Sequence, residues 1–214
     1  MTSTKDIHIH YQDEAIVVVD KPGGLLAVPG RGPDKLDCVV SRIRANIHGL
    51  IPQPAVHRLD MYTSGLMVLG ITCESHRNLS KQFEARTVIK EYEALLEGHV
   101  SGSCGEIRLR FRLDPGNRPL QVYDPQNGKM GITHWELLST TADNSRILFK
   151  PVTGRTHQLR LHAAHPLGLG CPIIGDSLYG SGKDGDPMFL HATRLIFTHP
   201  SSGSLLNFFS PPPF

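Results

Sequence analysis

The sequence has no long apolar run, no internal repeat and no paired cysteine motif, and each lack excludes a class of protein. No apolar stretch approaches the roughly 20 residues that a membrane-spanning helix needs, and the first residues lack the apolar segment of a signal peptide. The four cysteines form no Cys-x-x-Cys pair. Free thiols in a reducing, cytoplasmic compartment are therefore expected.

The chain also has little excess charge. Its net charge is +2 at pH 7 and its isoelectric point lies near 8.4. Proteins that coat nucleic acid without specificity are usually more basic, so the charge permits an RNA partner without indicating one. Any affinity for RNA must come from local patches. With 39% hydrophobic residues over 214 positions, the chain is long enough to bury a sizeable core.

Proline and glycine are plentiful and divide the chain into short segments. Sixteen prolines and 21 glycines favour strands and turns over a helical bundle. Apolar patterning predicts strands at residues 16–19, 25–28, 66–71, 88–96, 107–113, 132–138, 146–152, 195–198 and 205–209.

Helices are fewer in this pattern. Helical spacing predicts one over residues 34–48 capped by Asp34, one over 72–86 capped by Thr72, and a short one over 156–164. Strands outnumber helices and do not alternate regularly with them, so an α+β fold is expected. We expect one domain over residues 1–214, with residues 1–6 as a loose tail.

The first candidate for chemistry is Asp60, in the run His57-Arg58-Leu59-Asp60. An Asp on a tight turn between two strands is held by backbone geometry, as a catalytic group should be. Thr63 and Ser64 can hydrogen-bond turn amides, and Gly65 relaxes the steric limits. The simpler alternative is that Asp60 only caps a turn.

The second candidate is the run Gly154-Arg155-Thr156-His157-Gln158-Leu159-Arg160. The run contains two guanidiniums, those of Arg155 and Arg160. One of them can pair with a carboxylate while the other reaches a phosphate. The simpler alternative is a polar surface helix. A metal site is a further alternative, because His157, His162 and His165 crowd together, but on a helix His157 points about 140° away from His162 and no His-Glu-x-x-His run is present.

Two further features can serve a nucleic acid. Tyr92 lies on a predicted strand, where its ring either packs in the core or stacks on a base. Arg108, Arg110 and Arg112 alternate with apolar residues, so they share one face of a strand at a spacing of about 6–7 Å, close to that of successive phosphates. The alternative is an outer face exposed only to solvent.

Together these runs resemble the signature of RluA-type pseudouridine synthases. The run from His57 to Asp60 with Thr63-Ser64-Gly65-Leu66 is similar to the family's signature motif. The other runs similar to the family's motifs are Asp20-Lys21-Pro22-Gly23-Gly24-Leu25, Lys90-x-Tyr92, Gly154 to Arg160, Gly175-Asp176-x-x-Tyr179-Gly180 and Leu190-His191-Ala192. They occur in the family's order over about residues 14–210.

The chain departs from the family in two places. Cys171 stands where members more often have His, a departure that concerns the local loop shape and not the chemistry. Lys21 comes too early to leave room for the small RNA-binding extension that many members carry. The chain therefore resembles the short members, some of which modify both ribosomal and transfer RNA.

The resemblance implies a pseudouridine synthase catalytic fold, a large, mostly antiparallel mixed sheet with helices and loops around it and an RNA-binding cleft. It implies isomerisation of specific uridines to pseudouridine in structured RNA, with no metal and no organic cofactor. Asp60, Tyr92 and Arg160 would meet in the cleft. A cytoplasmic monomer is expected, because no unmatched apolar helix face stands out.

The resemblance also assigns roles. Asp60 would act on the ribose, Tyr92 would stack on the uracil, and Arg160 would pair with Asp60 and keep it ionised. The target base must be extruded from the RNA, and Arg58 can fill the vacated stack. The residues expected to contact RNA are Arg58, Arg155, His157, Arg108, Arg110 and Arg112. Two competing functions are a non-catalytic RNA-binding or RNA-folding factor and a metal hydrolase that uses the histidine cluster.

Overall fold

The computed structural model describes residues 7–214, so the predicted tail at 1–6 lies outside the described residues. The chain divides into two compact units. The first contains the chain up to Ile89 together with Ala192–Pro211, and the second contains Lys90–His191 together with Pro212–Phe214. No low-complexity linker marks this division in the sequence.

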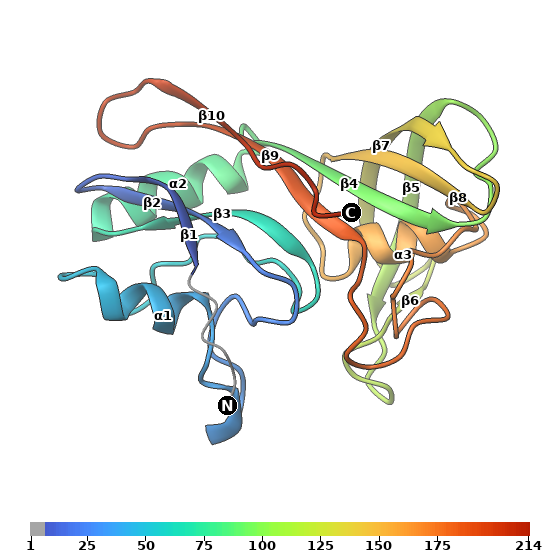
Figure 1. Ribbon diagram of the computed structural model, residues 1–214, viewed down its shortest axis with the longest axis horizontal. Coiled ribbons are helices and arrows are strands. Elements are labelled where there is room, and N and C mark those ends of the chain that lie inside the picture. Colours follow the sequence, from blue (N-terminus) through green and yellow to red (C-terminus); the bar gives the residue numbers. More distant parts are fainter. Residues whose placement is uncertain (1–6) are drawn as a thin grey trace. The chain divides into compact units, whose positions relative to one another are not determined.

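The first unit is a sheet with two helices. Its strands are β1 (His8–Gln12), β2 (Ile16–Lys21), β3 (Ser64–Gly70), β9 (Leu190–Thr198, which begins in the second unit) and β10 (Leu205–Phe209). Its helices are α1 (Val39–Asn46) and α2 (Cys73–Glu84), with a 3₁₀ turn at Pro33–Lys35. The strand order is β1-β2-β3-β9, and β10 pairs with β9 (Figure 1).

The core of this unit lies against β2 and β3. Every residue of β3 is buried, as expected for a strand covered on both faces. Val18 and Val68 pack with Leu79 of α2 and with Phe197 of β9. The predicted strand at residues 66–71 is therefore confirmed, with its ends shifted by one or two positions.

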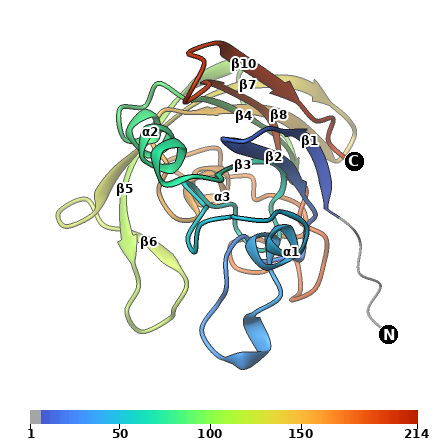
Figure 2. The ribbon, with the colours of Figure 1, turned by 90° about the vertical axis from the view of Figure 1, so that its left-hand side faces the viewer.

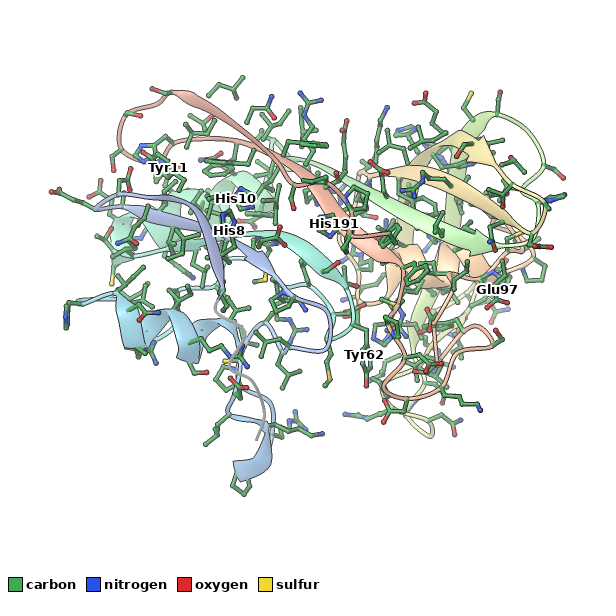
Figure 3. All side chains as sticks on the ribbon, viewed as in Figure 1. His8, His10, Tyr11, Tyr62, Glu97 and His191 are labelled. Atoms are coloured by element: carbon green, nitrogen blue, oxygen red, sulfur yellow. The ribbon has the colours of Figure 1, made fainter. Side chains whose placement is uncertain are left out.

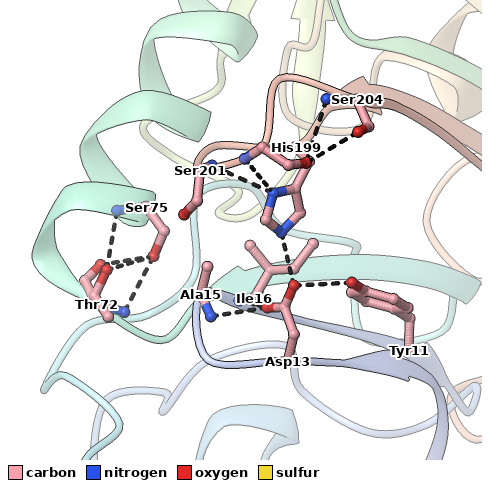
Figure 4. Close-up of polar contacts among 10 residues, drawn as sticks. Tyr11, Asp13, Ala15, Ile16, Thr72, Ser75, His199, Ser201 and Ser204 are labelled. Carbon is pink, nitrogen blue, oxygen red and sulfur yellow. Dashed lines mark hydrogen bonds and ion pairs between the residues drawn. The ribbon is translucent and has the colours of Figure 1, made fainter.

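The two helices begin differently from each other. Thr72 caps α2 as predicted, in a capping box with Ser75 (Figure 4). The prediction for α1 is wrong at its start, because Cys38 caps the helix and Asp34 lies in the preceding 3₁₀ turn. The predicted strand at 25–28 is also wrong, since only Leu26 forms an isolated bridge there.

The second unit is a five-stranded antiparallel arrangement. Its strands are β4 (Ile89–Glu97), β5 (Cys104–Leu113), β6 (Gln121–Tyr123), β7 (Lys129–Thr140) and β8 (Asn144–Pro151), in the order β4-β8-β7-β5-β6. Its helix is α3 (Gln158–Ala164). Figure 2 shows the loop between β5 and β6 projecting beyond both strands.

The alternation predicted for β5 is confirmed. Ile107, Leu109 and Phe111 are buried, whereas the arginines between them are exposed. The α+β class and the predominance of antiparallel strands are confirmed as well. In the described part of the chain, no helix is long and apolar enough to cross a membrane.

Asp13 and His199 join two hairpin turns of the first unit (Figure 4). The His199 Nε2 lies 2.8 Å from the Asp13 Oδ2. The His199 Nδ1 accepts the amide of Ser202 at 3.0 Å, so the proton of the neutral ring is on Nε2 and is donated to Asp13. Burial raises the pKa of Asp13, but the amides of Ile16 and Ala15 outweigh this and hold the pKa below 3.8.

We expect this contact to stabilise the first unit in a pH-dependent way. Asp13→Ala should lower the free energy of unfolding by about 1–3 kcal/mol at neutral pH, because several hydrogen bonds are lost. Since the pKa of Asp13 is lowered in the folded state, its contribution is complete above pH 3.8 and is lost as the pH falls through the folded pKa. Urea unfolding at several pH values measures this, and a difference from the wild type that persisted unchanged at pH 2 would contradict it.

Candidate active site

Asp60 lies on a closed turn of the first unit, between Leu59, which is buried, and the start of β3. The Thr63 amide donates to the Asp60 carbonyl at 3.1 Å and closes the turn. The Asp60 side chain is half-buried, and Tyr62 lies on the same loop (Figure 3). Arg58 is exposed and forms no hydrogen bond or ion pair with the other residues of 7–214. Its guanidinium is therefore available to a ligand, and its predicted contact with RNA stays a prediction.

The turn rests on the Lys21–Leu25 segment. The Met61 carbonyl accepts the Gly24 amide at 2.9 Å and the Lys21 Nζ at 2.9 Å. The Lys21 Nζ also donates to the carbonyls of Pro22 and Leu25, at 2.9 and 2.8 Å. Three carbonyls thus match the three N–H donors of one ammonium group. The structure gives the Asp20-to-Leu25 run a physical role, which is to hold the Asp60 turn in place.

The environment of Lys21 is unusual for a lysine. Its side chain is fully buried. Burial lowers its pKa to about 7, while the carboxylates of Asp60 and Asp20 raise it. The carboxylate of Asp60 therefore interacts electrostatically with a buried cation of its own unit.

Replacing Lys21 with Met should destabilise the protein. Three carbonyl oxygens would lose their donor, which we expect to cost about 3 kcal/mol of the free energy of unfolding. Denaturant unfolding measures the loss. Lys81→Met, at an exposed position of α2, is the control and should change the stability by less than about 0.5 kcal/mol.

The pH dependence of this variant is a second readout. The pKa of Lys21 is about 7 in the folded state and 10.5 in its absence. At a pH between these two values, Lys21 is therefore protonated in the unfolded chain and largely deprotonated in the folded protein. The contribution of Lys21 to stability should therefore rise as the pH increases from 7 towards 10.5. If the free energies of unfolding of the wild type and of Lys21→Met changed in parallel over this pH range, the lowered pKa of Lys21 would be contradicted.

His57 and Gly65 fix the two ends of the Asp60 segment. The His57 Nε2 accepts the Val68 amide at 3.1 Å, and its ring stacks on Phe83 with centroids 4.5 Å apart. Gly65 has φ +107°, and a Cβ there would lie 2.4 Å from the Ala192 carbonyl oxygen. Only glycine fits this close approach of two backbones.

Tyr92 and Arg160 belong to the second unit. Tyr92 is half-buried on β4, opposite Phe149 of β8. Arg160 is buried in α3, and its Nε and Nη2 donate to the two carboxylate oxygens of Asp176 at 2.7 and 2.6 Å. Asp176 is fully buried and also accepts the amide of Leu178. The carboxylate that holds Arg160 within its own unit is thus Asp176, whereas pairing with Asp60 stays a prediction.

Tyr179 links the predicted His157 and Arg160 positions. Its hydroxyl lies 2.9 Å from the His157 Nδ1 and accepts the Gln121 amide at 2.8 Å. Its ring faces the Arg160 guanidinium at 5.3 Å. His157 is only 8% exposed, so its ring serves the interior, and its predicted RNA contact stays a prediction.

The three arginines of β5 differ in their partners. Arg108 pairs with Glu106, and the Arg110 Nη1 donates to the Gly128 carbonyl at 3.2 Å. The Arg112 Nε donates to the Asp124 Oδ2 at 2.6 Å. Each of the three side chains thus has a partner in its own unit, and their predicted contact with RNA stays a prediction.

The predicted histidine cluster is spread over different environments. His157 contacts Tyr179, whereas the His165 Nδ1 accepts the Leu167 amide at 3.1 Å. His162 is fully buried, and desolvation with the nearby His165 lowers its pKa to about 4. Among residues 7–214, no group of three or more His, Cys, Asp or Glu side chains is placed to hold a metal ion.

Lys21, Asp176 and Tyr179 were not predicted as site residues. Each lies in one of the runs that carry the resemblance, so the signal was present. What was missing for Lys21 and Asp176 was their burial, because a lysine or an aspartate is ordinarily expected at the surface.

The chain is similar to known proteins over nearly its whole length. The family model described as RNA pseudouridylate synthase matches residues 15–165. The dual-specificity RNA pseudouridine synthase RluA of Escherichia coli K12 is 42% identical over 211 residues, covering 96% of this chain and 93% of that protein. The protein of the same name from Haemophilus influenzae is 41% identical, covering 94% and 91%.

Two solved structures share the fold. Human RNA pseudouridylate synthase domain containing 1 aligns with a TM-score of 0.80 at 27% identity, covering all of this chain and 86% of that one. Human RNA pseudouridylate synthase domain containing 4 aligns with a TM-score of 0.75 at 27% identity, covering 96% and 88%.

Proposed function

Because the chain belongs to the RNA pseudouridylate synthase family, we propose that it isomerises specific uridines to pseudouridine in structured ribosomal or transfer RNA. The observation that carries the proposal is the match over residues 15–165, a range that includes Asp60, Tyr92 and Arg160. The identity of 42% to an RNA pseudouridine synthase over 96% of the chain supports it.

The reaction breaks the bond between uracil N1 and the ribose, turns the base, and joins carbon 5 to the ribose. It requires an anionic group beside the sugar, and we assign this role to Asp60. An aspartate can attack the sugar or remove its 2′ proton, and the ionised form is needed for both. The turn that holds Asp60 through main-chain bonds supports the assignment, because it fixes the backbone that carries the carboxylate before substrate binds.

Tyr92 and Arg160 complete the proposed machinery. We assign Tyr92 to stacking on the uracil, since a base presents a flat π-face to an aromatic ring. Arg160 is a positioning residue, and its bidentate contact with Asp176 supports this because it fixes the guanidinium plane. Arg58 is assigned to the space that the extruded base leaves, and its exposed, unpaired side chain supports this.

Tritium release tests the activity. The protein should release tritium from RNA that carries 5-tritiated uridine, because carbon 5 loses its hydrogen when it joins the ribose. Binding of cellular RNA with no release from any fraction would instead favour a non-catalytic RNA-binding factor. A stoichiometric metal in the purified protein would favour the metal hydrolase.

The target and the working state are parts of the same proposal. The curated relatives are named dual-specificity enzymes, and we propose that this chain also acts on more than one RNA. Mapping of pseudouridines missing from cells without the gene identifies the targets. We further propose a cytoplasmic monomer, which light scattering and fractionation of cells test.

A further inference from the structure

A pocket of about 380 Å³ lies within the second unit. The end of β5, the start of β6, the turn before β7 and the loop before α3 form its walls. Lys129 and Arg155 line it, together with Arg112. No Asp or Glu is among the described residues that line it.

Two of these cations have no partner in residues 7–214. The side chains of Lys129 and Arg155 are exposed and form no hydrogen bond or ion pair with other described residues. Arg112 differs, because its Nε is held by Asp124 at 2.6 Å. The pocket therefore carries an excess of about two positive charges that only a ligand or solvent ions can balance.

One wall of the pocket is a rigid turn. The Asp124 Oδ1 accepts the amides of Gln126 and Asn127 at 3.1 and 2.8 Å. The amide of Asn127 and the guanidinium of Arg112 lower the pKa of Asp124 to about 2, so it stays ionised. A Cβ at Gly128 would lie 2.4 Å from the Asp124 carbonyl oxygen, so the turn has room only for glycine. Lys129 follows directly after this turn.

The opposite wall is fixed from within the unit. The Gln158 Oε1 accepts the Arg155 amide at 3.1 Å and the Thr153 hydroxyl at 2.7 Å. The Gln158 Nε2 donates to the Thr133 hydroxyl at 2.9 Å, which ties the loop to β7. The two threonines that bond to the Gln158 side chain, Thr153 and Thr133, are buried. The loop that presents Arg155 is therefore held by a buried hydrogen-bond network.

The hydroxyl of Tyr179 joins the two walls. It accepts the Gln121 amide from the β6 side and contacts the His157 ring from the loop side. His157 has φ +54°, a left-handed conformation that this contact helps to hold. The pocket is therefore preformed, which lowers the entropy cost of binding.

We propose that this pocket seats one phosphodiester of the RNA substrate, between Lys129 and Arg155. The inference rests on the proposed function for the identity of the ligand. Unpaired cations without a lining carboxylate select an anion, and the fork of Arg155 matches phosphate oxygens. The pocket is larger than a phosphate group alone, so it also admits the sugar next to it. Such a contact positions the RNA and does not read its sequence.

Salt-dependent binding tests the proposal. Lys129→Gln and Arg155→Gln should each raise the Kd for a fluorescent RNA stem-loop with unpaired loop uridines about 5-fold at low salt. Each should also reduce the slope of log K against log salt by about 0.7–0.9, the value for one phosphate contact. Lys150→Gln is the matched control, because Lys150 is exposed in the same unit and pairs with Glu136.

A neutral linkage identifies the phosphate itself. A methylphosphonate placed at one linkage at a time should weaken binding to the wild type at one position. At that position, the same methylphosphonate should leave the Kd of the double variant Lys129→Gln/Arg155→Gln unchanged, because the double variant has already lost both cations. Variants that bind with the wild-type Kd and slope, or an equal methylphosphonate effect on wild type and double variant, would overturn the proposal.

The two proposals fail separately. Absence of tritium release by the wild type would count against the proposed function, while the pocket would still be supported by a lower salt slope in its variants. Normal tritium release with unchanged RNA binding by the pocket variants would overturn the pocket alone.

Discussion

Asp60→Asn should reduce tritium release on the order of 10⁴-fold while RNA binding is retained. Asparagine has the shape of aspartate but no negative charge, so it can neither attack the sugar nor accept a proton from it. The turn should survive, because its closing hydrogen bond uses the main-chain carbonyl of Asp60. Single-turnover tritium release and fluorescence anisotropy measure the two quantities on the same RNA.

The control for this variant is Asp37→Asn. Asp37 is an exposed carboxylate of the same unit and pairs with Arg42. Its replacement should leave tritium release within about twofold of the wild type, since exposed ion pairs contribute about 0–1 kcal/mol. Full activity in Asp60→Asn would show that the catalytic carboxylate lies elsewhere.

Asp176→Asn should lower the free energy of unfolding by about 3–5 kcal/mol. Arg160 and Asp176 are 4% and 0% exposed at their side chains, and the substitution removes the negative charge of this buried pair. Tritium release should fall as well, because Arg160 would lose its fixed orientation. Urea unfolding measures the stability and separates it from the loss of activity.

A double variant tests whether the two residues act on stability as a pair. Arg160→Met in the Asp176→Asn background also removes the positive charge of the pair, while the asparagine oxygen can still accept the Leu178 amide. The double variant should therefore be more stable than Asp176→Asn alone. Additive losses would contradict this explanation. Asp37→Asn is again the control, because Arg42 donates to both carboxylate oxygens of Asp37 at the protein surface. Its effect on the free energy of unfolding should be much smaller than that of Asp176→Asn.

Most of the strands were predictable because apolar periodicity decides them. The strand at Leu205–Phe209 was predicted with its observed bounds, and the alternation of β5 gave its buried face. β1 was missed because its polar sequence, His8 to Gln12, is only partly buried and carries little apolar signal (Figure 3). The start of α1 was misplaced because a 3₁₀ turn precedes a cysteine cap, and cysteine is an uncommon cap.

The site was only partly predictable. The order of the motifs along the chain identified Asp60, Tyr92 and Arg160 as candidate site residues. The local spacing of each residue alone also fitted a simpler, structural explanation. The buried residues that hold these site residues in place could not be predicted from the sequence. Lys21 holds the Asp60 turn through carbonyl groups, which every residue has, so no sequence pattern marks its partners. The buried Asp176 is another case, because burial depends on contacts between distant segments.

The division of β9 between the units has a consequence for biosynthesis. The second unit is almost continuous in the chain, whereas the first needs Ala192–Pro211 in addition to its N-terminal part. About 100 residues separate Ile89 from Ala192, and at 5–20 residues per second the ribosome takes roughly 5–20 s to add them. During that interval β3 lacks its β9 neighbour and Asp13 lacks His199. The N-terminal part of the first unit thus waits for its remaining strands during translation, and its unpaired strand edge is the surface that a nascent-chain chaperone would meet.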